Sequence, residues 1–146
     1  MSAIDDLLAE EDRAWTLLHD CFAQIPTERF EEPTVTAEGW SPKDVMFHVG
    51  AWLADCARVL ERIHEGTFDR DEERVDIERQ NRAWFEASRA LDPREARAGF
   101  EGARQKAREC FATLGALTPD AREWFEESGA LHYPKHLADL RAWLAS

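Results

Sequence analysis

WSPKDVMFHVGAW, residues 40–52, contains the start of a helix and a histidine placed among residues of its apolar face. Ser41 suits the N-cap, Pro42 the first helical position and Asp44 the third, where a carboxylate can bond back to the cap. Apolar residues then recur three and four positions apart, which predicts a helix buried along one face. His48 lies at the edge of that face, so its ring nitrogens need hydrogen bonds, water or a metal ion.

The same spacing runs through the rest of the chain, and no stretch shows the sustained alternation that is typical of a strand. Capping residues, glycines and prolines divide the pattern into helices over 4–25, 42–65, 77–91, 93–114 and 131–146, with a turn or a short helical piece over 117–130. The predicted fold is an all-α four-helix bundle with a short additional helix between the second and third bundle helices. We expect a single domain over residues 1–146.

Composition and charge exclude several classes of function. The 146 residues include 30 acidic and 18 basic side chains, which gives a formal net charge of −12 at pH 7. Such a chain repels nucleic acid and anionic membranes unless its basic residues cluster, and the sequence contains no basic cluster. The first residues lack the pattern of a signal peptide, and no apolar run has the length of a membrane span. We therefore expect a soluble cytoplasmic protein that binds neither nucleic acid nor membranes.

Two further histidines lie near the end of the chain. His132 and His136 are four residues apart, a spacing that places two imidazoles on one face of a helix. With His48 they offer three neutral nitrogen ligands to zinc, nickel, copper or iron, with a position left open for water or substrate. Two alternatives stay open: the histidines are solvated or satisfied within the core, or a helix that begins at Pro134 leaves His132 in the preceding loop.

Three segments of the chain resemble a known family. They are GWSPKDVMFHVGAWLADCARVLERI (residues 39–63), VDIERQNRAWFEASRAL (75–91) and HYPKHLADL (132–140). In their order and separation they are similar to the DinB-like metal-binding four-helix bundles. The resemblance is to the branch that includes the N-terminal domains of mycothiol-dependent maleylpyruvate isomerases and the ClbS/DfsB-like proteins. It covers most of the chain and implies the same helical bundle.

The resemblance also implies a site. It places the metal ligands at His48, His132 and His136, with zinc or nickel as the expected divalent ion. Some relatives have a glutamate at the position of His132, so that position accepts either ligand. Asp139 would lie beside His136 and orient its ring without touching the metal. Asn81 matches a recurrent asparagine of the middle helix, which lines the pocket or caps a turn.

The activity that the resemblance implies is metal-dependent. It is the transfer of a low-molecular-weight thiol, of the mycothiol or bacillithiol type, to a small-molecule substrate, or the hydrolysis of a reactive electrophile, in either case for detoxification. The alternative is a non-catalytic bundle that binds a metal or a small molecule. The resemblance is also compatible with a homodimer that pairs through a helix face. Among the remaining polar residues, Arg79 or Arg82 could bind a substrate carboxylate, and the acidic segment 69–76 is either a solvated connection or the mouth of a cleft.

Overall fold

The structure, a computed structural model, describes residues 2–73 and 75–146, and every regular element in those ranges is helical. The elements are α1 (Ala3–Gln24), the short 3-10 helix η1 (Thr27–Arg29), α2 (Pro42–Glu65), α3 (Ile77–Ser88), α4 (Pro93–Ala112), α5 (Pro119–Ser128) and α6 (Tyr133–Ala145). The predicted all-α fold is confirmed. No helix in the described ranges is both long enough and apolar enough to cross a membrane.

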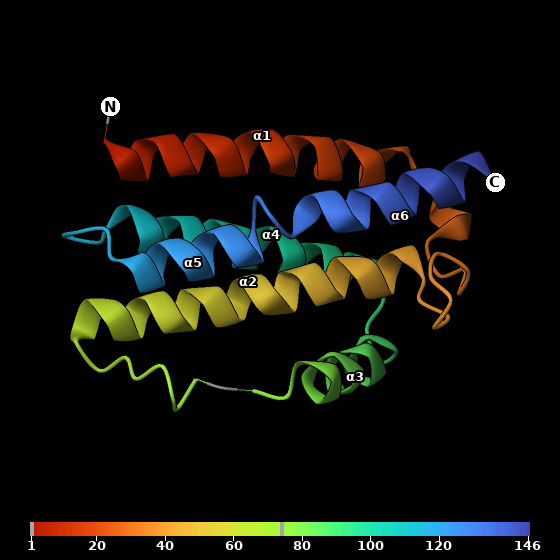
Figure 1. The fold of residues 1–146 in the computed structure, drawn as a ribbon. Coiled ribbons are helices and arrows are strands. Elements are labelled where there is room, and N and C mark those ends of the chain that lie inside the picture. The colour runs from red at the N-terminus through yellow and green to blue at the C-terminus, as the bar shows by residue number, and fades with distance from the viewer. Residues whose placement is uncertain (1, 74) are drawn as a thin grey trace.

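The place of the fourth bundle helix is taken by two shorter helices that follow each other end to end. In Figure 1, α1, α2 and α4 run alongside one another, and α5 and α6 follow each other along the remaining row. α5 packs mainly on α2, whereas α6 packs mainly on α1. The predicted additional helix is α3, which lies outside the bundle next to α2 (Figure 1). The break between α5 and α6, residues 129–132, therefore lies inside the length of the bundle rather than at its end.

Local hydrogen bonds fix both ends of α2, as the sequence predicts. Ser41 Oγ accepts a bond from the Asp44 backbone nitrogen at 3.1 Å, and the Asp44 carboxylate accepts one from the Ser41 backbone nitrogen at 2.8 Å. Pro42 lies in the first turn, and Gly66 ends the helix in the left-handed conformation at φ 76°. Because Ser41 and Asp44 are both buried, the start of α2 is anchored in the core, one turn before His48.

The core is packed most tightly where α2 crosses α4. Val45 and Val49 of α2 are completely buried. Gly50 comes so close to α4 that a Cβ atom added to it would lie 3.0 Å from Cα of Phe100. The Phe100 ring in turn stacks on Trp15 of α1, with 4.3 Å between ring centroids. This contact fixes the position of α2 close to the histidine that it carries.

α3 is attached to α2 at its middle and at its end. At the middle, Trp52 Nε1 donates a hydrogen bond to Asn81 Oδ1 at 2.9 Å, and the Trp52 and Trp84 rings meet edge to face at 4.7 Å. At its end, the Ser88 hydroxyl donates to the buried Asp44 carboxylate. These bonds hold α3 over one side of α2, and the side chains of α3 become available to any site formed there.

Candidate metal centre

Three histidines from distant parts of the sequence converge beside the break between α5 and α6. His48 comes from α2, while His132 and His136 come from the start of α6. Nε2 of His132 lies 3.1 Å from Nε2 of His48 and 2.9 Å from Nε2 of His136. Among the described residues, the three form a group whose potential ligand atoms all lie within 4.8 Å of one another. The structure thus brings together the three histidines that the sequence singled out.

The start of α6 keeps two of the histidines on one face despite the proline between them. α6 begins at Tyr133, and Pro134 lies in its first turn, where a helix needs no backbone N–H. His132 is the N-cap residue, but its backbone is already helical at φ −89° and ψ −46°. The spacing therefore acts as it would inside a helix, and the His132 and His136 ring centroids lie 4.6 Å apart.

Burial keeps the three imidazoles neutral. Desolvation, reinforced by the two neighbouring imidazoles, lowers the pKa of His48 to about 2. Burial and the nearby His136 lower the pKa of His132 to about 3, while burial and the charge of Lys135 lower the pKa of His136 to about 4. At neutral pH each ring therefore retains a lone pair on one nitrogen, which is the form of histidine that binds metal ions.

The donor set and its geometry fit a transition metal. Zinc–nitrogen bonds of about 2.0–2.1 Å place neighbouring ligand nitrogens about 2.9–3.4 Å apart for bond angles between octahedral and tetrahedral values. The two Nε2 separations at His132, 2.9 and 3.1 Å, fall within that range. The Nδ1 atoms of His48 and His136 are buried and have no hydrogen-bond partner in the described part of the chain, whereas the His132 ring is close enough to the Ser128 backbone for a hydrogen bond that raises its pKa against the effect of burial. Packing therefore orients the His48 and His136 rings, and Nε2 is the nitrogen that both direct at His132.

Asp139 does not make the contact that the resemblance implies. Its side chain is exposed, and Nδ1 of His136 has no hydrogen-bond partner within residues 2–73 and 75–146. Residues three apart project about 60° away from each other around a helix, so the short Asp139 side chain stays on the solvent side of the buried ring. Among the described residues no bond therefore joins Asp139 to His136, and the orienting role of Asp139 stays a prediction.

A cavity of about 790 Å³ opens beside the histidines, within the usual size range of small-molecule sites. Trp52 of α2, Trp124 of α5 and the neighbouring Val75 and Ile77 supply its apolar walls. Asn81 also lines the cavity, one of the two roles that the sequence suggested for it. Because an indole N–H can only donate, the bond from Trp52 engages the amide oxygen of Asn81, and its amide nitrogen has no hydrogen-bond partner among residues 2–73 and 75–146.

The basic residues that line this cavity are not the ones that the sequence suggested. Arg79 and Arg82 are exposed and lie outside the lining, which instead includes Arg70 and Lys135. Arg70 is engaged by Asp120 of α5 at 2.6 Å. Lys135 is exposed near two histidines, whose pKa values it helps to lower. The sequence indicated a place for Lys135 in the cavity lining only through its position between His132 and His136 in HYPKH.

Part of the acidic connection between α2 and α3 lines the cavity through Arg70, Glu73 and Val75, while most of its described residues are exposed. Glu73, whose side chain is only 4% exposed, accepts hydrogen bonds from Arg58 at 2.5 and 3.2 Å. A further bond at 3.3 Å comes from Arg62, and the pKa of Glu73 is lowered mainly by its bonds to Arg58. Arg70, in the same connection, ties it to α5 through Asp120. The connection is thus held to both sides of the cavity.

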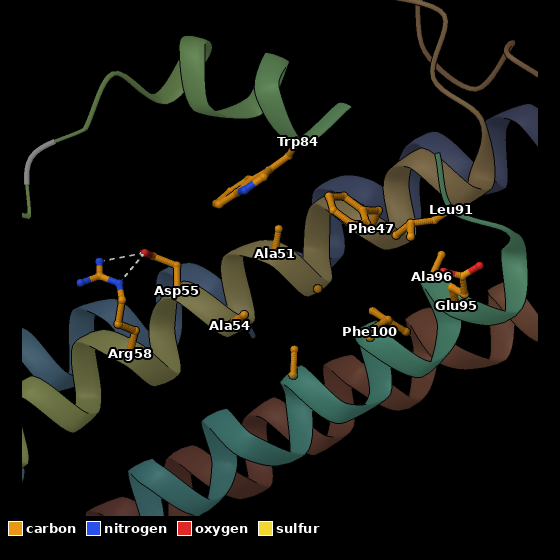
Figure 2. A pocket seen from close by; sticks show the side chains of 13 residues that line it. Phe47, Ala51, Ala54, Asp55, Arg58, Trp84, Leu91, Glu95, Ala96 and Phe100 are labelled. Atoms are coloured by element: carbon orange, nitrogen blue, oxygen red, sulfur yellow. Dashed lines mark hydrogen bonds and ion pairs between the residues drawn. The ribbon is translucent and has the colours of Figure 1, made fainter. Parts of the chain in front are cut away.

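A second cavity, of about 480 Å³, lies between α2, α3 and α4. Figure 2 shows Trp84 of α3 extending toward Ala51 of α2, with Phe100 on the neighbouring α4. The lining is mainly apolar. Its Arg58 side chain donates a hydrogen bond from Nη2 to Asp55 Oδ1 at 2.9 Å. This cavity does not include the histidine cluster. The histidine cavity is therefore the candidate site.

The sequence matches a known family along nearly its whole length. The family described as mycothiol maleylpyruvate isomerase N-terminal domain matches residues 12–145. The chain belongs to this family. All three segments that carry the resemblance lie inside the match, as do the three clustered histidines, so the predicted relationship is confirmed. Searches of curated proteins and of solved structures found no match.

Proposed function

We propose that this member of the mycothiol maleylpyruvate isomerase N-terminal domain family is a divalent-metal-dependent enzyme. His48, His132 and His136 would hold the ion through Nε2 and leave at least one coordination position open. The observation that carries the proposal is the convergence of three neutral imidazoles beside a cavity of about 790 Å³. A structural zinc site is normally closed by a fourth protein ligand, and the described residues place no fourth His, Cys, Asp or Glu in this group.

The residues of the cavity support a bimolecular reaction on small molecules. A zinc or nickel ion bound there would lower the pKa of a coordinated thiol or water and polarise a substrate carbonyl. Trp52 and Trp124 would hold the apolar part of a substrate, and the exposed Lys135 would attract an anionic group toward the histidines. Asn81 would donate a hydrogen bond from its amide nitrogen to an acceptor on the substrate.

Transfer of a low-molecular-weight thiol to a reactive electrophile is the reaction that we favour, with hydrolysis of such an electrophile as the second form of the same chemistry. The description of the family names a thiol, mycothiol, and this supports a thiol as one of the two substrates. Either reaction would remove a reactive compound, which is a detoxification role. The alternative is a bundle that binds the ion and a small molecule without turnover.

The first test is the metal content of protein purified without chelators, followed by titration with zinc and nickel. We expect about one ion per chain, the stoichiometry of a single three-histidine site. His48→Ala and His136→Ala should each abolish tight binding. His64→Ala is the matched control, because His64 is an exposed histidine on the same helix as His48. Undiminished binding by His48→Ala would refute the site, and the absence of binding by the unaltered protein would refute metal dependence.

A second measurement separates an enzyme from a binding protein. The metal-loaded protein is incubated with mycothiol and either maleylpyruvate or an aryl halide, and loss of the electrophile is followed by absorbance. Enzymatic function predicts turnover that disappears on chelation and returns with zinc or nickel. Binding of the thiol or the electrophile without turnover, across both electrophiles and both metals, would support the non-catalytic alternative.

A further inference from the structure

Glu11 of α1 is an almost completely buried carboxylate, with 1% of its surface exposed. It accepts hydrogen bonds from Nε and Nη2 of Arg104 at 2.9–3.2 Å and from Nη1 of Arg108 at 2.7 Å. Its Oε2 atom also accepts a bond from the Tyr133 hydroxyl at 2.8 Å. Side chains from α1, α4 and α6 therefore meet at a single carboxylate.

Tyr133 brings this network next to the histidines. It is the first residue of α6, it is completely buried, and it directly follows His132. The backbone nitrogens of His132 and Tyr133 both donate to the Gly129 carbonyl, at 2.8 and 2.9 Å. Gly129 also leaves room for the network, since a Cβ atom there would lie 3.1 Å from the Phe125 carbonyl oxygen, 3.3 Å from Cγ of Glu11 and 3.6 Å from the Tyr133 hydroxyl. The break that carries His132 is thus joined to α1 and α4 through one tyrosine hydroxyl.

Stability alone does not explain a charged group in this position. Desolvation of buried ions is costly, and apolar side chains of similar volume often stabilise a protein as well or better. A fully satisfied buried network instead favours one arrangement of the elements around it. Because a carboxylate oxygen can only accept, the Tyr133 hydroxyl is the donor in its 2.8 Å bond to Glu11 Oε2. The network around Glu11 therefore favours one position of the backbone at the start of α6, and His132 is part of that backbone.

We infer that Glu11 and Tyr133 are positioning residues for the histidine cluster. The hydrogen bond between them sets the place of the His132 ring relative to His48 and His136, and neither residue touches the ion. This inference rests on the proposed function and adds to it a role for α1, which supplies none of the three histidines. It predicts that the network controls metal affinity separately from its contribution to folding.

The test compares Tyr133→Phe with Thr34→Ala. Tyr133→Phe removes only the hydroxyl and leaves Glu11 paired with both arginines, so the fold is retained. Thr34→Ala is the matched control, because Thr34 accepts a hydrogen bond from Trp143 at 2.9 Å, near the opposite end of α6. Cobalt(II) is the probe, and its affinity and visible absorption spectrum are measured alongside the melting temperature.

We expect Tyr133→Phe to weaken cobalt binding about tenfold, the lower end of the range for residues that support metal ligands, and to change the spectrum. Thr34→Ala should change neither the affinity nor the spectrum, and its loss of melting temperature should be smaller because Thr34 is exposed and its bond involves no charged group. As a second variant, Gly129→Ala keeps every hydrogen-bonding group but crowds the Phe125 carbonyl as well as Glu11 and the Tyr133 hydroxyl, and it should also weaken binding.

The outcomes distinguish this inference from the proposed function. Cobalt affinities of Tyr133→Phe and Gly129→Ala within twofold of the unaltered protein would overturn the positioning role and leave the metal site standing. Equal weakening by Thr34→Ala would also overturn it, since a general loosening of α6 would then be the cause. If the unaltered protein binds no cobalt, zinc or nickel, the proposed function fails and this inference fails with it.

Discussion

Gly50→Ala should destabilise the protein although alanine is the better helix former. The added Cβ would lie 3.0 Å from Cα and 3.4 Å from the backbone nitrogen of Phe100. These are backbone atoms, so no side-chain rotation relieves the overlap and α2 must move away from α4. Overpacking of this kind costs about 1–3 kcal/mol, whereas the gain in helix propensity is about 0.8–1.0 kcal/mol. We expect a net loss of about 1 kcal/mol in the free energy of unfolding.

Gly99→Ala provides the control on α4, because a Cβ atom at Gly99 meets nothing within 4 Å. It should stabilise the protein by about 0.5–1 kcal/mol through helix propensity alone. Urea unfolding followed by circular dichroism would measure both variants, and melting temperatures should shift by about 2–4 °C per kcal/mol in opposite directions. Since Gly50 lies two residues after His48, the displacement of α2 should also weaken cobalt binding. Equal stability of the two variants would refute the close approach of α2 and α4.

Two further predictions concern the histidines and the wall of the cavity. Acidification below about pH 6.5 should destabilise the metal-free protein by up to about 1.4 kcal/mol per pH unit for each clustered histidine. The reason is that these histidines bind protons in the unfolded chain but remain neutral in the folded chain. The folded pKa values extend this window down to about pH 4 for His136, about pH 3 for His132 and about pH 2 for His48, and stability that stays constant in urea titrations from pH 7.5 to 5 would contradict it. Glu73→Gln should weaken the attachment of the connection by about 1 kcal/mol, a value kept small because Arg58 is half exposed. Backbone amide hydrogen exchange of residues 67–73 should then be faster. Unchanged exchange would show that contacts other than those of Glu73 keep the connection in place.

Much of the fold could be predicted because its signals act over short distances. Ser41, Pro42 and Asp44 determine the start of α2 within a few residues, and Gly66 ends it in the same local way. The spacing of apolar residues likewise predicts which face of each helix is buried. The succession of α5 and α6 along one row was not predictable in this way, since it depends on which neighbouring helix each one packs against.

The candidate site was predicted in its residues but not in its surroundings. His132 and His136 are recognisable by their spacing and His48 by its place at the edge of an apolar helical face. The resemblance assigns all three as metal ligands, although His48 lies 84 positions before His132. The described residues show no contact between Asp139 and His136, and the orienting role of Asp139 stays a prediction. The sequence gives the position of a carboxylate around a helix but not whether the ring beside it is buried. Trp124 and Lys135 were missed as cavity residues for a similar reason, as periodicity does not separate pocket walls from core or surface.

The sequence by itself determined the helices, their caps and the family, because these depend on residue types and on spacings of a few positions. Only the tertiary structure decided that the Nε2 atoms of His48 and His136 both meet Nε2 of His132, that burial keeps the three imidazoles neutral, and that Glu11 of α1 holds the start of α6 through Tyr133. Each of these depends on side chains about 80 to 120 positions apart being packed within hydrogen-bond distance. Such distances are set by how whole helices pack, and local sequence pattern does not encode that packing.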